Sequence, residues 1–78
     1  MYKMPSMSSD KLSSLLEKGG AVFVRQRRTS HAIYARIVEG KRYSAPIIMG
    51  KKTLDPNYSK RVFRQLKFKD KEIEKLLE

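Results

Sequence analysis

The stretch HAIYARIVEGKRYSAPII, residues 31–48, decides the fold predicted for this chain. Two strand-like runs, 31–38 and 41–48, stand on either side of Glu39-Gly40, and a short connection with glycine predicts a β-hairpin. The second run alternates between two faces, with Tyr43, Ala45 and Ile47 on one and Arg42, Ser44 and Pro46 on the other. Because proline has no N–H for a ladder, this run belongs at a sheet edge or at a bulge.

A further strand is expected before the hairpin, at residues 21–27, followed by a tight polar turn at 27–30. Its beginning is apolar on both faces, so the sequence leaves its inward register open. The run 31–38 has two distinct faces, with Ala32 and Tyr34 on one and His31, Ile33 and Ala35 on the other. Together the three runs predict an antiparallel meander.

Helices are predicted on both sides of this meander. The first runs from its cap Ser8 to Lys18 and ends at Gly19-Gly20. Its apolar stripe consists of Leu12, Leu15 and Leu16. A short helix near the C-terminus is expected from about Asp70 to Leu77.

A second long helix begins at Asp55-Pro56, where aspartate serves as the cap and proline as the first helical residue. It is expected to reach about Lys67, with Tyr58, Val62 and Leu66 recurring on its inward face. The resulting order predicts an α+β sandwich of two layers. We assign residues 8–78 to one domain and residues 1–7 to an N-terminal extension.

Charge is the strongest global signal. Eighteen Lys and Arg against eight Asp and Glu give a formal net charge of +10 over 78 residues. Such a balance in a small domain favours a polyanionic partner. Nucleic acid is the first candidate, an acidic protein the second and an anionic membrane surface the third. The alternative is a soluble basic protein without a polyanionic partner.

Several classes of site are disfavoured by the residue inventory. The chain has no cysteine and a single histidine, so a structural zinc site is not expected. No apolar run approaches the ~20 residues of a membrane span, and the N-terminus lacks the apolar core of a signal peptide. The motifs of nucleotide-binding loops and serine hydrolases are absent, and no carboxylate cluster suits a metal-dependent nuclease. We expect no cofactor or metal, and a cytoplasmic location.

His31 is the leading candidate for chemistry. A histidine side chain ordinarily titrates near neutral pH, and RNA cleavage needs both a base for the 2′-OH and an acid for the leaving 5′-oxygen. Cations and hydroxyls that suit a phosphate lie nearby in sequence: Arg25, Arg27, Arg28, Thr29 and Ser30. The alternative is that His31 only closes a turn or bonds a backbone carbonyl.

The second long helix carries further candidates for contact with an RNA backbone. Lys60 and Arg64 lie on its basic face, which is otherwise an ordinary solvated helix surface. The aromatic residues suit the core better than a base-stacking platform, and this applies to Phe23, Tyr34, Tyr43, Tyr58 and Phe63.

Six segments follow one another in a characteristic order: KLSSLLEKGG (11–20), VFVR (22–25), SHAIY (30–34), Ala45-Pro46, LDPNYSKRVFRQL (54–66) and FKDKEIEKLL (68–77). Their order and spacing resemble the HicA family of small toxins from toxin–antitoxin pairs. The resemblance implies a double-stranded-RNA-binding-domain-like α-β-β-β-α sandwich with a short C-terminal helix. It also implies metal-independent cleavage of messenger RNA, neutralisation by a HicB-type antitoxin, and a functional histidine at His31.

The chain departs from the family pattern at two positions. Thr29 stands where the family usually has glycine, and Ile48 stands where a histidine commonly follows the strand proline. The leading hypothesis is a toxin ribonuclease that uses His31. A non-catalytic RNA-binding module of the same fold is the alternative, and docking on an acidic protein is a third possibility.

Overall fold

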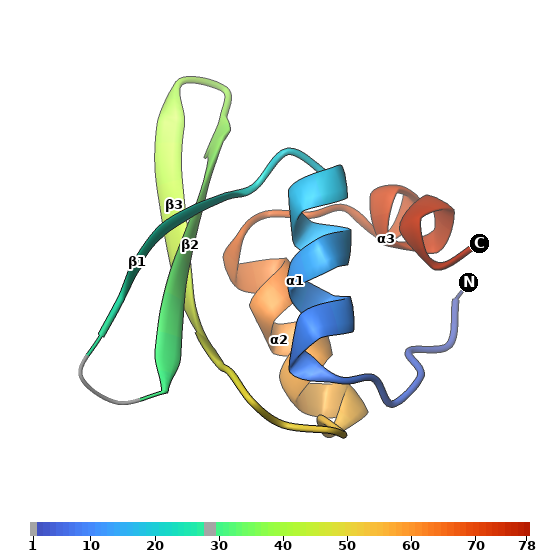
Figure 1. The fold of residues 1–78 in the computed structure, drawn as a ribbon. Helices are drawn as coiled ribbons and strands as arrows, with labels where there is room; N and C mark the ends of the chain where they lie inside the picture. The colour runs from blue at the N-terminus through green and yellow to red at the C-terminus, as the bar shows by residue number, and fades with distance from the viewer. Residues whose placement is uncertain (1, 28–29) are drawn as a thin grey trace.

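The computed structural model describes residues 2–27 and 30–78 and contains three helices and three strands. In chain order these are α1 (Ser9–Lys18), β1 (Val22–Gln26), β2 (His31–Val38), β3 (Lys41–Ile48), α2 (Pro56–Gln65) and α3 (Asp70–Leu77). The strands form one antiparallel sheet in the order β1-β2-β3, and the helices lie on one side of it (Figure 1). This confirms the predicted α+β architecture and leaves one face of the sheet without a covering layer.

The hairpin β2–β3 has the bounds that the sequence predicts. Its strands pair from His31 opposite Ile48 to Val38 opposite Lys41 without a register shift. Glu39 and Gly40 both have positive φ, at 51° and 80°, which matches the right-handed twist of the flanking strands. Only glycine adopts such angles without a steric cost, so Gly40 is suited to this turn.

Strand β1 differs more from its prediction. It covers Val22–Gln26, one residue less at each end than the predicted 21–27. Its pairing with β2 shifts between Phe23 and Arg25, which makes Val24 the extra residue of a β-bulge. The shift reverses the alternation of side chains at this point, and this explains why the sequence pattern left the inward register open.

Capping residues begin the two longer helices as predicted. The Ser8 hydroxyl accepts from the N–H of Lys11 over 3.1 Å, and the Asp55 carboxylate accepts from the N–H of Asn57 over 2.7 Å. Helix α2 ends at Gln65, two residues before the predicted Lys67. The physical reason is that Lys67 has a left-handed φ of 61°, which turns the chain out of the helix.

The core lies between the sheet and the helices. The inward residues of the hairpin, Ala32, Tyr34, Ala45 and Ile47, are all at most 4% exposed. They meet buried residues of α1 and α2, among them Leu12, Leu16, Val62, Phe63 and Leu66. Each such side chain contributes about 1.5–3 kcal/mol through burial, which is a large share of what a domain this small has available.

Four of the five aromatic residues assigned to the core contribute to it. Tyr34 and Phe63 are buried, while Tyr43 and Tyr58 are half-buried and pack against the core. The assignment is wrong for Phe23, which is 52% exposed. Its ring meets Tyr34 edge-on at a centroid distance of 5.8 Å, but β1 is an edge strand and no helix covers its outer side.

The segment before Ser8 packs on the domain rather than extending away from it. Met4 and Met7 belong to the buried core, and Tyr2 packs against it. Met7 also forms a β-bridge with Leu54, whose N–H donates to the Met7 carbonyl over 2.7 Å. Residues 2–7, assigned by sequence to an extension, therefore add apolar contacts to the fold.

Arg36 joins the sheet to the turn between α2 and α3. Its guanidinium donates to the carbonyls of Leu66 and Lys67 over 3.2 and 3.0 Å and forms an ion pair with Glu72. Burial alone would raise the pKa of Glu72, but the Lys69 N–H and the Arg36 guanidinium outweigh it and lower that pKa.

Across the described residues, no helix has the length and apolar composition that crossing a membrane requires.

Candidate nucleic-acid interface

His31 occupies the first position of β2, at the end of the sheet remote from the hairpin turn. Its carbonyl accepts from the N–H of Arg27 over 2.8 Å, and its neighbour Ser30 accepts from the N–H of Met49 over 2.6 Å. All three strands are therefore tied together beside His31. The histidine is half-buried, and it is not without an interaction partner in the folded protein.

Helix α1 is anchored at the same end of the sheet. Ser9 is fully buried, and its hydroxyl donates to the carbonyl of Ile48 over 2.6 Å while accepting from the N–H of Lys51 over 3.1 Å. Because Ile48 is the residue paired with His31, this contact supports the strand end next to the histidine.

Pairing within the sheet brings His31 together with two predicted RNA-binding residues. Arg25 lies opposite Ile33, and the ladder continues so that Arg27 lies opposite His31. Cross-strand partners share one face of a sheet, and Ile33 follows His31 by two residues. His31, Arg25 and Arg27 therefore lie on the same face of the sheet, opposite to the one that packs against the helices.

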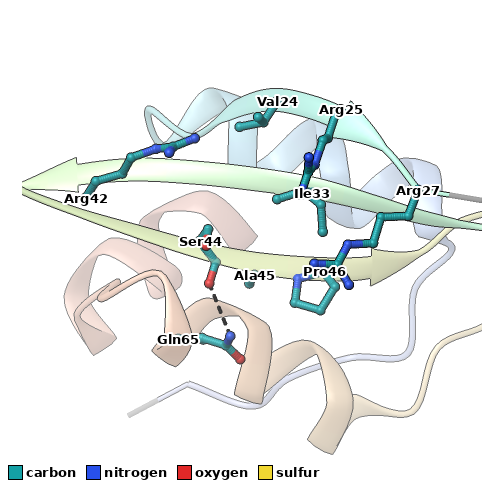
Figure 2. Close-up of a pocket in the computed structure, with 9 residues that line it drawn as sticks. All are labelled: Val24, Arg25, Arg27, Ile33, Arg42, Ser44, Ala45, Pro46 and Gln65. Carbon is teal, nitrogen blue, oxygen red and sulfur yellow. Dashed lines mark hydrogen bonds between the residues drawn. The ribbon is translucent and has the colours of Figure 1, made fainter.

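This open face contains a hollow of about 410 Å³ (Figure 2). Its residues come from all three strands and from α2: Val24, Arg25, Arg27, Ile33, Arg42, Ser44, Ala45, Pro46 and Gln65. Three arginines surround a floor formed largely by Ile33 and Pro46, and Figure 2 shows the side chain of Arg27 reaching toward Pro46. The three arginines are exposed: Arg25 lies on β1, Arg27 directly after it, and Arg42 on β3.

The charge on the open face has one sign. The alternation and the register assign to it Val22, Arg25, Arg27, His31, Ile33, Ala35, Ile37, Arg42, Ser44, Pro46 and Ile48 among the described residues. This set contains three arginines and no carboxylate. A guanidinium presents a planar fork of donors that matches a phosphate, so the face suits a polyanion more than a cation.

Not all predicted binding residues belong to this face. Lys60 and Arg64 lie on α2 in the helical layer, where the Lys60 ammonium sits 5.7 Å from the centre of the Tyr2 ring. Arg64 borders a separate hollow of about 510 Å³ near the hairpin turn. The structure thus divides the predicted set between two layers. Arg28 and Thr29 lie outside the described residues.

Arg42 is a lining residue that was not among the sequence-based candidates. It lies opposite Ile37 on β3, at an outward position of the alternating run. The alternation alone identified its face, but only the pairing of β1 with β2 shows that Arg25 and Arg27 share that face.

Within the described part of the chain, no three His, Cys, Asp or Glu side chains group together to hold a metal ion.

Comparisons of the chain with protein-family models, with curated proteins and with solved structures found no match.

Proposed function

We propose that the protein binds RNA on the open face of its sheet and cleaves it with His31. The observation that carries this proposal is the ladder at the start of β2, which puts His31 on the same face as Arg25 and Arg27. A proton-transfer group thereby lies next to two exposed cations that suit a phosphate.

Binding in this proposal rests on electrostatic attraction. The open face offers three arginines, and none of its described residues is a carboxylate that could pair with them in place of RNA. The whole chain carries a net charge of +10. Neutralising RNA phosphates releases counterions, so affinity should fall steeply as salt rises. Lys60 and Arg64, in the other layer, extend the basic surface beyond the open face.

Cleavage in this proposal needs only a proton transfer and charge stabilisation. The imidazole of His31 takes the proton from a ribose 2′-OH, O2′ forms a bond to phosphorus, and the bond from phosphorus to O5′ breaks. The products are a 2′,3′-cyclic phosphate and a 5′-hydroxyl, whose proton comes from water. The arginines stabilise the charge that develops on the phosphate, and acid–base help of this kind is typically worth about 10²–10⁴-fold in rate.

The resemblance to HicA toxins extends this proposal to a biological role. The protein would act on messenger RNA in the cytoplasm and be held inactive by an antitoxin. A non-catalytic RNA-binding module is the second candidate. It is favoured by the surroundings of His31, because the assigned open-face residues supply no second histidine to act as the acid.

The deciding experiment compares the parent protein with His31→Ala on labelled RNA in the presence of a chelator. The variant should remain folded by circular dichroism, bind RNA almost as the parent does and cut at least about 10²-fold more slowly. Ser14→Ala, at an exposed position of α1 in the helical layer, is the matched control and should cut normally.

Three other outcomes contradict the proposal in different ways. A parent that binds RNA without cutting it supports the binding module. A folded His31→Ala protein that cuts at the parent's rate excludes His31 as the catalytic group. A variant that loses activity by unfolding assigns His31 a structural role.

A further inference from the structure

The two edges of the sheet differ in whether their outward backbone groups are covered by other parts of the protein. On β3, side chains of α2 cover the outward backbone groups: Gln65 Nε2 donates to the carbonyl of Ser44 over 3.1 Å (Figure 2). The hydroxyl of Tyr58 accepts from the N–H of Ile48 over 3.0 Å and donates to the carbonyl of Pro46 over 3.3 Å. Pro46 itself has no N–H to present. The β3 edge is thereby closed to another strand.

These contacts also identify which backbone groups of β1 face outward. In an antiparallel pair, residues alternate between turning their N–H and C=O toward the partner and away from it. Ser44, Pro46 and Ile48 turn theirs away from β2, so their partners Ala35, Ile33 and His31 turn theirs toward β1. The bond from Arg27 to His31 follows this pattern.

The intervening residues of β2, Ala32 and Tyr34, consequently turn their backbone groups toward β3. Their partners on β1 are Gln26 and Phe23. The peptide groups of Gln26 and Phe23 therefore point away from the sheet, where another strand can pair with them. Among the described residues, no side chain hydrogen-bonds to this edge in the way that Gln65 and Tyr58 bond to β3.

The side chains along β1 are unusually apolar for an exposed edge. Val22, Phe23 and Val24 are 60%, 52% and 39% exposed, and they are three of the four large hydrophobic residues exposed in the described chain. Natural sheets protect an edge with a helix, a proline, charges or a bulge. Here only a bulge at Val24 and the polar residues after it serve this purpose, so half of the strand remains apolar and open.

We propose that the outer edge of β1 docks an extended segment of a second protein whose side chains alternate between apolar and acidic. Backbone bonds to Phe23 and Gln26 would supply affinity, as in other cases of strand addition. Apolar side chains of the segment would cover Phe23, which lies on the face of Tyr34, and its carboxylates would lie on the open face and meet Arg25 and Arg27.

Charge selects this occupant over a second copy of the chain. Pairing two β1 edges would bring the arginines of both copies together and give an assembly of +20, from 10 + 10. An acidic segment instead neutralises them. RNA fits this edge less well, because it has no regular series of N–H and C=O groups and no aliphatic side chains to cover Phe23.

Occupation of this edge affects the open face. Arg25 and Arg27 line the hollow of the open face and also flank the β1 edge. Carboxylates bound at this edge therefore pair with the same guanidinium groups that would contact a phosphate. The acidic segment and RNA should therefore compete. The docking inference itself depends on the free edge of β1 and not on RNA cleavage.

The probe is a synthetic peptide of alternating valine and glutamate, blocked at both ends and labelled for fluorescence anisotropy. It should bind the parent protein, while a peptide of alternating valine and lysine should not. Gln26→Pro removes an outward N–H without touching the inner ladder, whereas Gln26→Ala keeps it. Gln26→Pro should weaken peptide binding about tenfold or more, and Gln26→Ala should bind as the parent does.

Hydrogen exchange on the parent protein keeps the test independent of how the proline variant folds. Peptide binding should slow exchange of the Phe23 and Gln26 amides and leave that of the Arg25 amide, which already faces β2, almost unchanged. Equal binding of both peptides, equal affinity of both Gln26 variants while folded, or protection confined to other strands overturns the inference. A concentration-dependent dimer of the parent with the same protected amides would instead assign the edge to a second copy.

The outcomes for docking and for RNA cleavage are separable. Loss of peptide binding by Gln26→Pro with normal RNA cleavage supports docking and the proposed function together. If the peptide binds as expected but the parent does not cut RNA, docking stands and the ribonuclease proposal fails. If RNA is cut but the peptide does not bind, only the docking inference fails.

Discussion

The backbone N–H of Arg27 donates to the carbonyl oxygen of His31 over 2.8 Å, which closes the ladder between β1 and β2 at the end of the sheet remote from the hairpin turn. This bond fixes Arg27 opposite His31 and so puts a guanidinium on the same face as the imidazole. Any ligand whose phosphate reaches Arg27 is thereby brought to the face that carries His31.

Removing this guanidinium tests where RNA binds. Arg27→Ala should weaken RNA binding and reduce the slope of log affinity against log salt by about 1, because one phosphate contact is lost. Arg61→Ala removes the same charge from an exposed position of α2 and should leave the slope nearer that of the parent. Anisotropy titrations at several salt concentrations measure both. Equal losses in the two variants would mean that binding is spread over the whole basic surface.

The inward face of α2 is tested by a buried charge. Val62 is 4% exposed, so Val62→Asp buries a carboxylate without a partner and should cost at least about 3 kcal/mol, enough to unfold much of a small domain. Its neighbour Arg61 is exposed, and Arg61→Asp should melt close to the parent. Thermal melts followed by circular dichroism compare them. A Val62→Asp protein with the parent's Tm would show that this face does not pack on the sheet.

The Glu72 contacts predict a pH-dependent loss of stability. The pKa of Glu72 is lowered in the folded protein, so its carboxylate stabilises the fold above the ordinary glutamate value of 4.5, and this contribution is lost as pH falls through the lowered pKa. Glu72→Gln should therefore lower the Tm by a few degrees at neutral pH and by progressively less in acid. Glu78→Gln, at the exposed C-terminus, is the control. A constant Tm difference from neutral pH to strong acid would contradict the assignment.

The N-terminal segment should contribute to stability. Met4 is 9% exposed and packs in the core, so Met4→Ala should cost about 2 kcal/mol, the lower end of the range for such truncations. Lys3→Ala changes an exposed neighbour and should be almost neutral. Urea denaturation at equilibrium gives both values. If the two variants are equally stable, the packing of residues 2–7 on the domain contributes little to the free energy of unfolding.

Local patterns were sufficient to predict most elements. The hairpin at residues 31–48 follows from the turn Glu39-Gly40 and the alternation of residues 41–48, and α2 begins at the Asp55-Pro56 signal. These features depend on residues close together in the chain, whose dihedral preferences and spacing are readable directly. The end of α2 was predicted two residues late because the left-handed Lys67 has no signal of its own; Arg36, distant in sequence, bonds the carbonyls of that turn.

The sequence by itself determined the order of elements, the basic charge, and the choice of His31 with its arginines as a candidate group. Only the tertiary structure decided which of these residues meet. It put Arg25, Arg27 and Arg42 around one hollow, left Lys60 and Arg64 in the other layer, and exposed Phe23 on an uncovered edge. The physical reason is that strand register, a bulge and the cover of a sheet edge depend on pairing between distant segments, which no local periodicity encodes.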